Sequence, residues 1–284
     1  MPTTPKPLSV AIICKNNVDT IGRTLESVRG LGLEIVAVDS GSTDGTLELL
    51  AQHGARIIEI EWMGYVETVQ FAYEQCEQPW VLPLDSDESL EPELRASIEA
   101  LDLQAEPTNA REPSGYRVNR KVFYQGRYFE HTWQPEWRMR LVRKERFRWH
   151  GMNPHYDLRP IDPAETVEDL TGDLRHEAFA TFGQMLGKQL SHAQVMARSM
   201  HQAGKHPSVR RLAWAPVAAV WKAAVVRGGF RDGKRGWAAA GTIAAGTLMK
   251  YVLLFELTDG AGSKSDRITR DGARFAAAKS ADRR

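Results

Sequence analysis

The first hundred residues alternate between short apolar runs and amphipathic segments that end in glycine or polar residues. The apolar runs are short and continuous, which is typical of strands buried on both faces. The predicted strands cover residues 8–14, 34–41, 55–62 and 80–85, and the predicted helices cover 20–31, 43–54, 66–76 and 91–101. Strands separated by helices of this length form a parallel sheet with right-handed crossovers. We therefore predict an α/β fold with a doubly wound, mostly parallel sheet.

The last third of the chain has a different pattern. Two apolar segments, 212–229 and 236–257, flank the basic turn FRDGKR and are predicted helices. The second approaches the ~20 residues that span a bilayer, but it contains Lys250 and Glu256. We favour a segment that lies on a lipid surface, and the alternative is a helix pair packed on the α/β domain or on a second subunit of a homo-oligomer. The predicted domains are 1–210, a membrane-proximal helical appendage at 211–260, and a polar, disordered tail at 261–284.

Composition narrows the class of protein. With 284 residues, of which 42% are hydrophobic, the chain can bury a large core. Its two cysteines, Cys14 and Cys76, have no spacing that indicates a disulfide scaffold or a zinc site. The N-terminal apolar run is too short for a secretory signal. We therefore expect a protein of the reducing cytoplasm.

Charge is divided unevenly along the chain. Residues 1–100 contain 6 Lys and Arg against 17 Asp and Glu, whereas residues 205–235 contain 8 against 1. The acidic N-terminal segment and the basic segment near the C-terminus are therefore expected to meet different partners. Because the basic segment adjoins apolar helices, we expect it to meet an anionic membrane surface, at the inner face of the cytoplasmic membrane.

Acidic side chains follow two of the predicted strands. Asp39 and Asp44 follow the second strand, and Asp85 and Asp87 follow the fourth. Ligands of doubly wound sheets bind beyond the carboxyl ends of the strands. No G-x-G-x-x-G or Walker pattern follows a strand, so neither a dinucleotide fold nor a P-loop is supported. Carboxylates hold a diphosphate through a hard cation, so the pattern predicts a site for Mg²⁺ or Mn²⁺.

A structural interpretation of the same acidic run is also open. A carboxylate at a strand end often lies in a solvated loop or caps the next helix, and Glu88 or Glu91 could do so here. The position of D-x-D after the fourth strand, together with Asp39 and Asp44 after the second, favours the metal site.

The motifs also resemble a known family. The chain is similar to family 2 glycosyltransferases of the GT-A fold, and within them to the lipopolysaccharide core β-1,4-glucosyltransferase-like group. The segments that carry the resemblance, in the expected order, are LSVAIICKNN (8–17), AVDSGSTDGT (37–46), WVLPLDSDE (80–88), QPEWRMRLVRK (134–144), WHGMNPHYDL (149–158), RHEAFATFGQMLGKQ (175–189) and GGFRDGKRGWAAA (228–240). The likeness covers most of the chain.

The resemblance implies a role for each matching residue. Asp39 would contact the uracil or ribose side of a nucleotide, and Asp44 would support that loop. Asp85 would face the ribose and the metal, and Asp87 would be the main metal ligand. The acidic residue of the segment Pro135-Glu136-Trp137 would be the catalytic base, which makes Glu136 the candidate.

Three further residues follow from the same resemblance. His155 matches a position that can reach the metal or the donor diphosphate, although it could equally be a buried structural histidine. Asn16 and Asn17 stand where the family usually has Asn-Glu, so Asn16 would hydrogen-bond the nucleotide without a neighbouring acid. Where the group usually has Gln-Lys-Asn, this chain has Val69 between Thr68 and Gln70. Either the donor differs from the group's usual one, or a basic residue such as Arg140 or Arg143 supplies the missing positive charge to the diphosphate.

The resemblance predicts an inverting transfer of a hexose from a UDP-linked or other nucleotide-sugar donor. Glucose is the expected hexose, because the similar group consists of glucosyltransferase-like proteins. The acceptor would be a lipopolysaccharide-core, lipid-linked or other envelope saccharide. The departures at Asn17 and Val69 keep open a non-catalytic protein that binds nucleotide sugars. The basic and aromatic segment 116–149 is compatible with core packing, with an acceptor site or with a nucleic-acid surface, and we expect no nucleic-acid partner.

Overall fold

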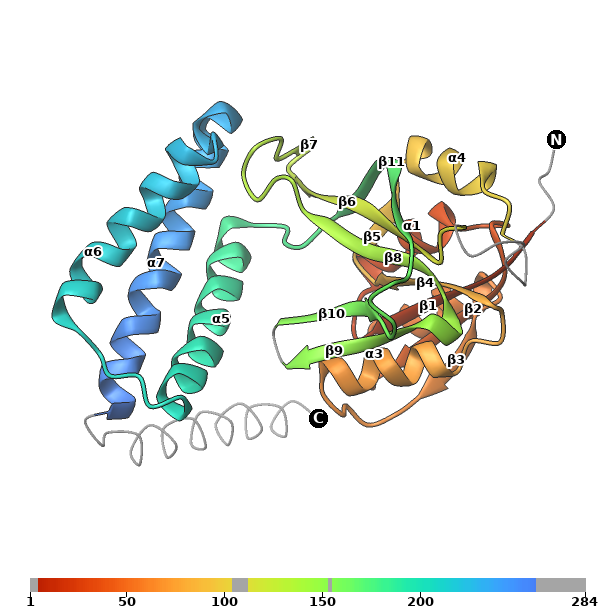
Figure 1. Ribbon diagram of the computed structural model, residues 1–284, viewed down its shortest axis with the longest axis horizontal. Helices are drawn as coiled ribbons and strands as arrows, with labels where there is room; N and C mark the ends of the chain where they lie inside the picture. Colours follow the sequence, from red (N-terminus) through yellow and green to blue (C-terminus); the bar gives the residue numbers. More distant parts are fainter. Residues whose placement is uncertain (1–4, 104–111, 153–154, 259–284) are drawn as a thin grey trace. The chain divides into compact units, whose positions relative to one another are not determined.

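The computed structural model describes residues 5–103, 112–152 and 155–258, and it divides into two compact units, residues 1–180 and 181–284 (Figure 1). The tail predicted over 261–284 lies outside the described residues. The first unit holds a sheet with helices on both faces, and the second consists of helices. This confirms the predicted α/β fold with C-terminal helices.

The sheet of the first unit is mostly parallel. Its strands are β1 (Lys6–Cys14), β2 (Gly32–Asp39), β3 (Arg56–Glu59), β4 (Trp80–Asp85), β5 (Glu88–Leu90), β6 (Gly115–Tyr124), β7 (Arg127–Tyr128), β8 (Trp137–Arg143) and β11 (Val167–His176). They lie in the order β3-β2-β1-β4-β8-β6-β11-β5, and β7 pairs with β6. Strands β9 (Phe147–Met152) and β10 (His155–Pro160) form a separate antiparallel pair.

Helices cover both faces because successive strand residues point to opposite sides. The helices of this unit are α1 (Val18–Ser27), α2 (Thr46–Gln52), α3 (Tyr65–Glu74) and α4 (Pro92–Ala100), with a 3₁₀ turn η1 at Lys144–Arg146. Val10 and Ile12 of β1 join a buried core with α1, α2 and α4, whereas Ala11 between them joins another core with Tyr73 of α3. The continuous apolar run of β1 thus reflects burial on two sides.

Strand β8 interrupts the parallel run. It lies antiparallel to β4 on one side and to β6 on the other. Its first residues therefore lie at the edge of the sheet where the parallel strands end. This places the segment around Glu136 and Arg140 beside the Asp85–Asp87 turn.

Strand β11 closes the sheet between β6 and β5. A register shift between Asp169 and Asp173 contains Gly172, which has φ +93°. A Cβ at Gly172 would lie 2.2 Å from the backbone nitrogen of Leu94, so only glycine lets α4 pack this close to the strand.

Over residues 181–258, the part of the second unit that the structure describes, there are three long helices. They are α5 (Phe182–Gln202), α6 (Val209–Val220) with its π-helical extension η2 (Trp221–Val226), and α7 (Gly233–Thr258), which follows the 3₁₀ turn η3 (Gly229–Asp232). Thr181 caps α5, since its Oγ1 accepts the backbone N–H of Gln184 at 3.1 Å. Helix α7 packs against both α5 and α6. This compact unit begins at Thr181 because α5 contacts α7, and the predicted domain bounds at 210 and 260 stay a prediction.

One helical stretch among the described residues, Gly229–Thr258, is long and apolar enough to cross a membrane by length and composition. Of the most apolar 18 residues of this stretch, 22% are buried within the molecule. The stretch corresponds to the predicted apolar segment 236–257.

Candidate active site

The carboxyl ends of β1, β2 and β4 meet at one edge of the sheet. In the strand register Cys14 lies opposite Asp39, and Ile13 lies opposite Asp85. Burial, and then the charge of Asp39, raise the pKa of the Cys14 thiol far above its ordinary value. Cys14 is therefore a buried neutral thiol. The charged groups at this edge of the sheet are the carboxylates.

Asp39 holds the loop after β2. It is fully buried, and its Oδ1 accepts the backbone N–H groups of Gly41 at 2.8 Å and Ser42 at 2.7 Å. Its Oδ2 accepts the Ser42 hydroxyl and the Cys14 thiol. Because both carboxylate oxygens are used within the protein, Asp39 shapes the loop, and its predicted contact with a nucleotide stays a prediction.

Asp44 and Asn16 tie the loops after β1 and β2 together. Asp44 accepts the N–H of Val18 at 3.1 Å and the hydroxyl of Thr46 at 2.6 Å. The Thr46 hydrogen bond is the main cause that lowers the pKa of Asp44. Asn16 has φ +53°, a conformation that Asn tolerates, and its Oδ1 accepts the N–H of Thr43 at 2.8 Å. The support predicted for Asp44 therefore extends to Asn16.

Glu88 is the centre of a buried ionic network. Its side chain is fully buried, and Arg140 binds it with two nitrogens, Nε at 3.0 Å and Nη2 at 2.7 Å. Arg120 contacts it at 3.1 Å. Burial opposes ionisation of Glu88, but the charges of Arg140 and Arg120 outweigh it and lower its pKa to about 2. Glu88 begins β5 and does not cap α4, so the interpretation of Glu88 as a helix cap was wrong.

Asp85 is the partly exposed member of this network. Its Oδ2 lies 3.5 Å from Arg140 and 3.7 Å from Arg120, and its side chain is 32% exposed. Burial and the charge of Glu88 raise the pKa of Asp85 above its usual range. Arg140 was predicted to bind a diphosphate, but it is 6% exposed and its bidentate partner is Glu88. Arg140 therefore holds Glu88 in place, and its predicted contact with a diphosphate stays a prediction.

Glu136, the predicted base, lies between two guanidinium groups. Its Oε1 accepts hydrogen bonds from Arg120 Nη2 at 2.7 Å and from Arg138 Nη2 at 2.6 Å, and its side chain is 22% exposed. Burial opposes ionisation, but the hydrogen bonds and charges of Arg120 and Arg138 hold the pKa of Glu136 below its usual value. Glu136 is thus an ionised carboxylate with a fixed orientation and some access to solvent.

Asp87 faces a histidine that the sequence did not single out. His176, the last residue of β11, places Nε2 at 3.5 Å from Asp87 Oδ2, and its buried Nδ1 has no hydrogen-bond partner. Oxygen and nitrogen donors bound to one cation at about 2.1 Å lie roughly 3 Å apart, so this pair fits a divalent ion. Among the described residues no group of three His, Cys, Asp or Glu forms a ready metal site. His155 begins β10, and its side chain lies outside the described part.

Three functional candidates escaped the sequence analysis: Glu88 as a network centre, Arg120 and His176. Their partners are distant in the chain, since Arg120 meets residues 88 and 136 and His176 meets residue 87. The sequence does not distinguish Arg120, since Arg117 and Lys121 in the same stretch GYRVNRKVFY are also charged.

The aromatic residues of segment 116–149 are divided between core and surface. Tyr116, Tyr124, Phe129 and Phe147 are buried, whereas Trp137 is 42% exposed. Core packing therefore accounts for much of this composition.

A second aromatic group lies close to the acidic edge. Tyr65 stacks on Tyr156 with centroids 5.9 Å apart, and Trp149 contacts Tyr156 at 5.6 Å. Burial, and then the negative charge of Asp85, raise the pKa of Tyr156 above its usual value. Trp62 extends the group through an edge contact with Tyr65 at 4.8 Å.

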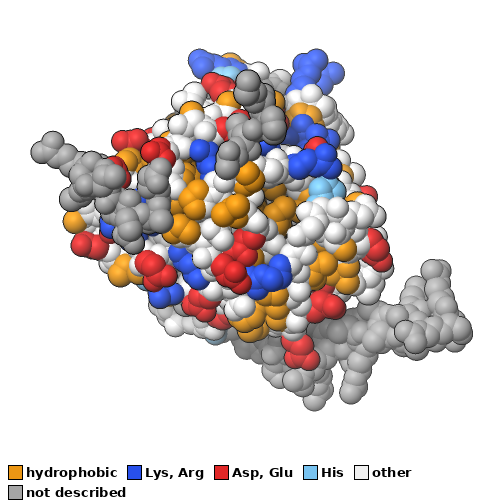
Figure 2. Space-filling view, turned by 90° about the vertical axis from the view of Figure 1, so that its right-hand side faces the viewer, with side chains coloured by type: hydrophobic (Ala, Val, Ile, Leu, Met, Phe, Trp, Pro, Cys, Tyr) orange, Lys and Arg blue, Asp and Glu red, His pale blue; other side chains and the backbone are white. Residues whose placement is uncertain are grey.

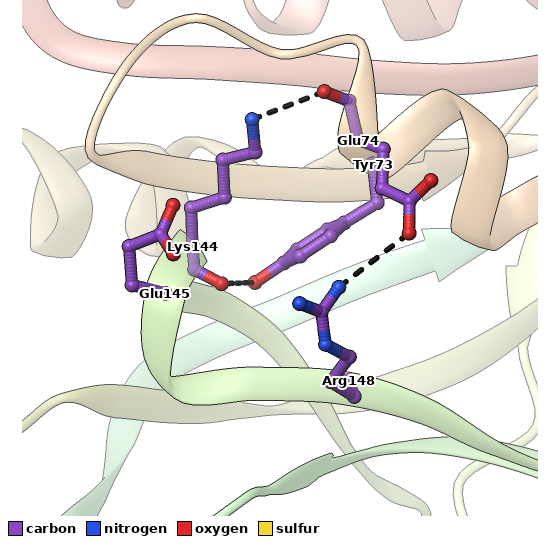
Figure 3. Close-up of a pocket in the computed structure, with 5 residues that line it drawn as sticks. All are labelled: Tyr73, Glu74, Lys144, Glu145 and Arg148. Carbon is purple, nitrogen blue, oxygen red and sulfur yellow. Dashed lines mark hydrogen bonds and ion pairs between the residues drawn. The ribbon is translucent and has the colours of Figure 1, made fainter.

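A cavity of about 230 Å³ lies elsewhere and is lined by charged side chains and one tyrosine (Figure 3). The Tyr73 hydroxyl donates to the Lys144 carbonyl at 2.9 Å, and Lys144 Nζ donates to the Glu74 carbonyl at 3.0 Å. Lys144 follows the carboxyl end of β8, which is antiparallel to its neighbours. The cavity is therefore at the edge of the sheet away from Asp85 and Asp87, and it does not belong to the site.

Comparisons with known proteins agree with this geometry. The family model "Glycosyl transferase family 2" matches residues 9–157. A lipopolysaccharide core biosynthesis glycosyltransferase, LpsC of Rhizobium meliloti, is 31% identical over 74% of this chain and 77% of its own length. An uncharacterized glycosyltransferase of Rickettsia bellii is 25% identical over 89% of this chain and 87% of its own. A mannosyltransferase of Pyrobaculum calidifontis, solved with GDP-Man and Mn²⁺, is 14% identical at a TM-score of 0.49, with 89% of this chain and 88% of that chain covered. The chain is a glycosyltransferase, and it belongs to glycosyl transferase family 2.

Proposed function

We propose that this enzyme is a metal-dependent, inverting hexosyltransferase that uses a nucleotide-sugar donor, UDP-glucose in the first instance, and an envelope saccharide acceptor. The observation that carries the proposal is the arrangement at one sheet edge of Asp87 beside His176 and of Glu136 within the arginine network. This brings together two candidate metal donors, Asp87 and His176, and one ionised carboxylate, Glu136.

Asp87 and His176 are the proposed metal ligands, with Asp85 facing them from the same turn. When bound, Mn²⁺ or Mg²⁺ would neutralise the charge that grows on the leaving diphosphate. Arg120 and Arg140 fix the orientation of Asp85 and Glu88, so the turn that carries Asp87 is held before the donor arrives. His155 stays a further proposed ligand.

The loops after β1 and β2 are the proposed nucleotide-binding edge. Asp39 and Asp44 hold their shape from within, and the exposed residues Asn16 and Thr43 would meet the donor. Asn17 uses its Oδ1 to accept the N–H of Lys15 at 2.8 Å, so the residue that replaces the family's acid serves the loop itself.

Glu136 is the proposed base. It would accept the proton of the acceptor hydroxyl while that oxygen attacks the anomeric carbon from the face opposite the leaving group. Arg120 and Arg138 keep Glu136 ionised and point it in one direction. The rings of Tyr65, Tyr156 and Trp149 offer flat apolar surfaces to the sugar of the acceptor.

The proposed class of acceptor is supported by the similarity to LpsC. The relative LpsC is named for lipopolysaccharide core biosynthesis, which supports a lipopolysaccharide-core or other lipid-linked acceptor. Such an acceptor is presented at a membrane, and we propose that the enzyme works as a peripheral protein on the inner face of the cytoplasmic membrane.

The test is release of nucleoside diphosphate from a panel of UDP-, GDP- and dTDP-sugars with Mn²⁺, Mg²⁺ or EDTA. We expect release from one donor with metal and a loss of about 10³-fold in Asp87→Ala. Asp169→Ala is the matched control, because Asp169 forms an exposed ion pair with Arg117. Donor binding with no release under any condition, acceptor present, would identify a non-catalytic binder instead.

A further inference from the structure

The exposed side of α6 and η2 carries large apolar side chains. Trp214 is 67% exposed, Val217 57%, Trp221 62% and Val225 37%. Their spacing of three, four and four residues places them along one side of the helix. We name these four residues the tryptophan face. Tryptophan of this exposure is costly in water and is enriched where one side of a protein meets lipid headgroups.

The opposite side of the same helix is packed. Ala223 and Ala224 are buried against Ala240 of α7, with Val220 and Ile243 beside them. The helix is therefore anchored by one side and holds the tryptophan face outward. The tryptophan face is therefore exposed even though the helix that carries it is packed against α7.

Cations border the tryptophan face. Arg210, Arg211, Lys222 and Arg227 lie on the same helix and are exposed, and the turn that follows adds Arg231 and Lys234. The segment 205–235 contains a single acid, Asp232. On the face shown in Figure 2, by contrast, acidic and basic side chains are interspersed among hydrophobic ones. The combination of apolar rings and cations on one helix is what an anionic lipid surface attracts.

We propose that the tryptophan face docks on an anionic membrane surface, with its rings at the headgroup boundary and its cations on the lipid phosphates. This deepens the proposed function, because it names the surface by which the enzyme would reach a lipid-linked acceptor. A second copy of the chain fits less well, since pairing two such faces would bring their cations together without acids to match them. The helix also lies along the surface rather than across it, because Arg210, Arg211 and Lys222 interrupt its apolar residues.

The test is co-sedimentation of the full chain with phosphatidylcholine vesicles that contain or lack phosphatidylglycerol. We expect binding to the anionic vesicles only, weakened by salt, with a blue shift of tryptophan fluorescence. Trp214→Ser/Trp221→Ser should lower binding at least tenfold, and Arg211→Glu/Lys222→Glu should do the same. Trp62→Ser is the matched control, because Trp62 is 46% exposed on the other unit, and it should bind as the wild type does.

Three outcomes would overturn the proposal. They are equal binding to neutral vesicles, membrane association that resists high salt and alkaline carbonate, and a dimer in solution that the tryptophan variant converts to a monomer while vesicle binding persists. The assay contains neither donor nor acceptor. Vesicle binding is therefore independent of the transferase proposal, whose failure would appear in the separate donor-release assay as absent turnover.

Discussion

The carboxylates that follow β2 and those that follow β4 lie at the same edge of the sheet but are held in different ways. Asp39 and Asp44 accept backbone N–H groups and hydroxyls of their own loops. Asp85 and Glu88 face guanidinium groups from other strands, and Asp87 faces an imidazole. The charges of Asp39 and Asp44 are stabilised by nearby N–H and O–H dipoles, and these hydrogen bonds fix the shape of the loop. The charges of Asp85 and Glu88 are instead balanced by arginines from strands that are distant in the sequence.

The largest expected effect is on the β4 side. Glu136→Gln should lower sugar transfer about 10²–10⁴-fold, because the amide cannot take a proton from the acceptor. Donor binding should stay near its wild-type value. The measurement is kcat with saturating donor, and Glu165→Gln, which alters an ion pair with Arg146, is the control. Unchanged transfer would reduce Glu136 to an ionic partner of Arg120 and Arg138.

The next effect tests the buried network. Glu88→Gln should lower the free energy of unfolding by about 3–5 kcal/mol, since it leaves Arg120 and Arg140 without their shared buried carboxylate. Urea unfolding followed by circular dichroism measures the change. Asp157→Asn, at an exposed pair with Arg159, should cost less than about 1 kcal/mol. If the free energy of unfolding fell by less than about 1 kcal/mol in both variants, Glu88 would contribute no more to stability than an exposed surface charge.

The same residue predicts a dependence on pH. The pKa of Glu88 is lowered from 4.5 to about 2, so its contribution to stability is complete above pH 4.5 and is lost as the pH falls towards 2. The stability gap between the wild type and Glu88→Gln should therefore close over this range. Urea midpoints measured along a pH series follow the gap, and a constant gap would contradict the ionic explanation.

The smallest effect belongs to the β2 side. Asp39→Asn should lower the free energy of unfolding by about 1–2 kcal/mol, because charge-assisted hydrogen bonds to the loop are weakened. The KM for the donor should change less than it does in Asp87→Ala. A large rise in KM with unchanged stability would instead place Asp39 on the nucleotide and erase the distinction between the two sets.

The sequence predicts the elements of the first hundred residues well, because buried parallel strands are continuous apolar runs and their helices end in glycine. It cannot separate Asp39 from Asp85, since both follow such runs and only their partners differ. Arg120 and His176 are invisible for the same reason: their meaning depends on pairing between β6, β8, β5 and β11. The unit boundary at 181 depends likewise on the packing of α5 on α7.

The place of β11 in the sheet has a consequence for how the enzyme matures. Strand β5 follows Asp87 directly, but it pairs with residues 174–176 at the far end of the first unit. During synthesis the D-x-D turn therefore leaves the ribosome about ninety residues before the imidazole that faces it. A chain arrested before His176 has the acidic turn without its partner, so the proposed metal site can be complete only after β11 has been synthesised.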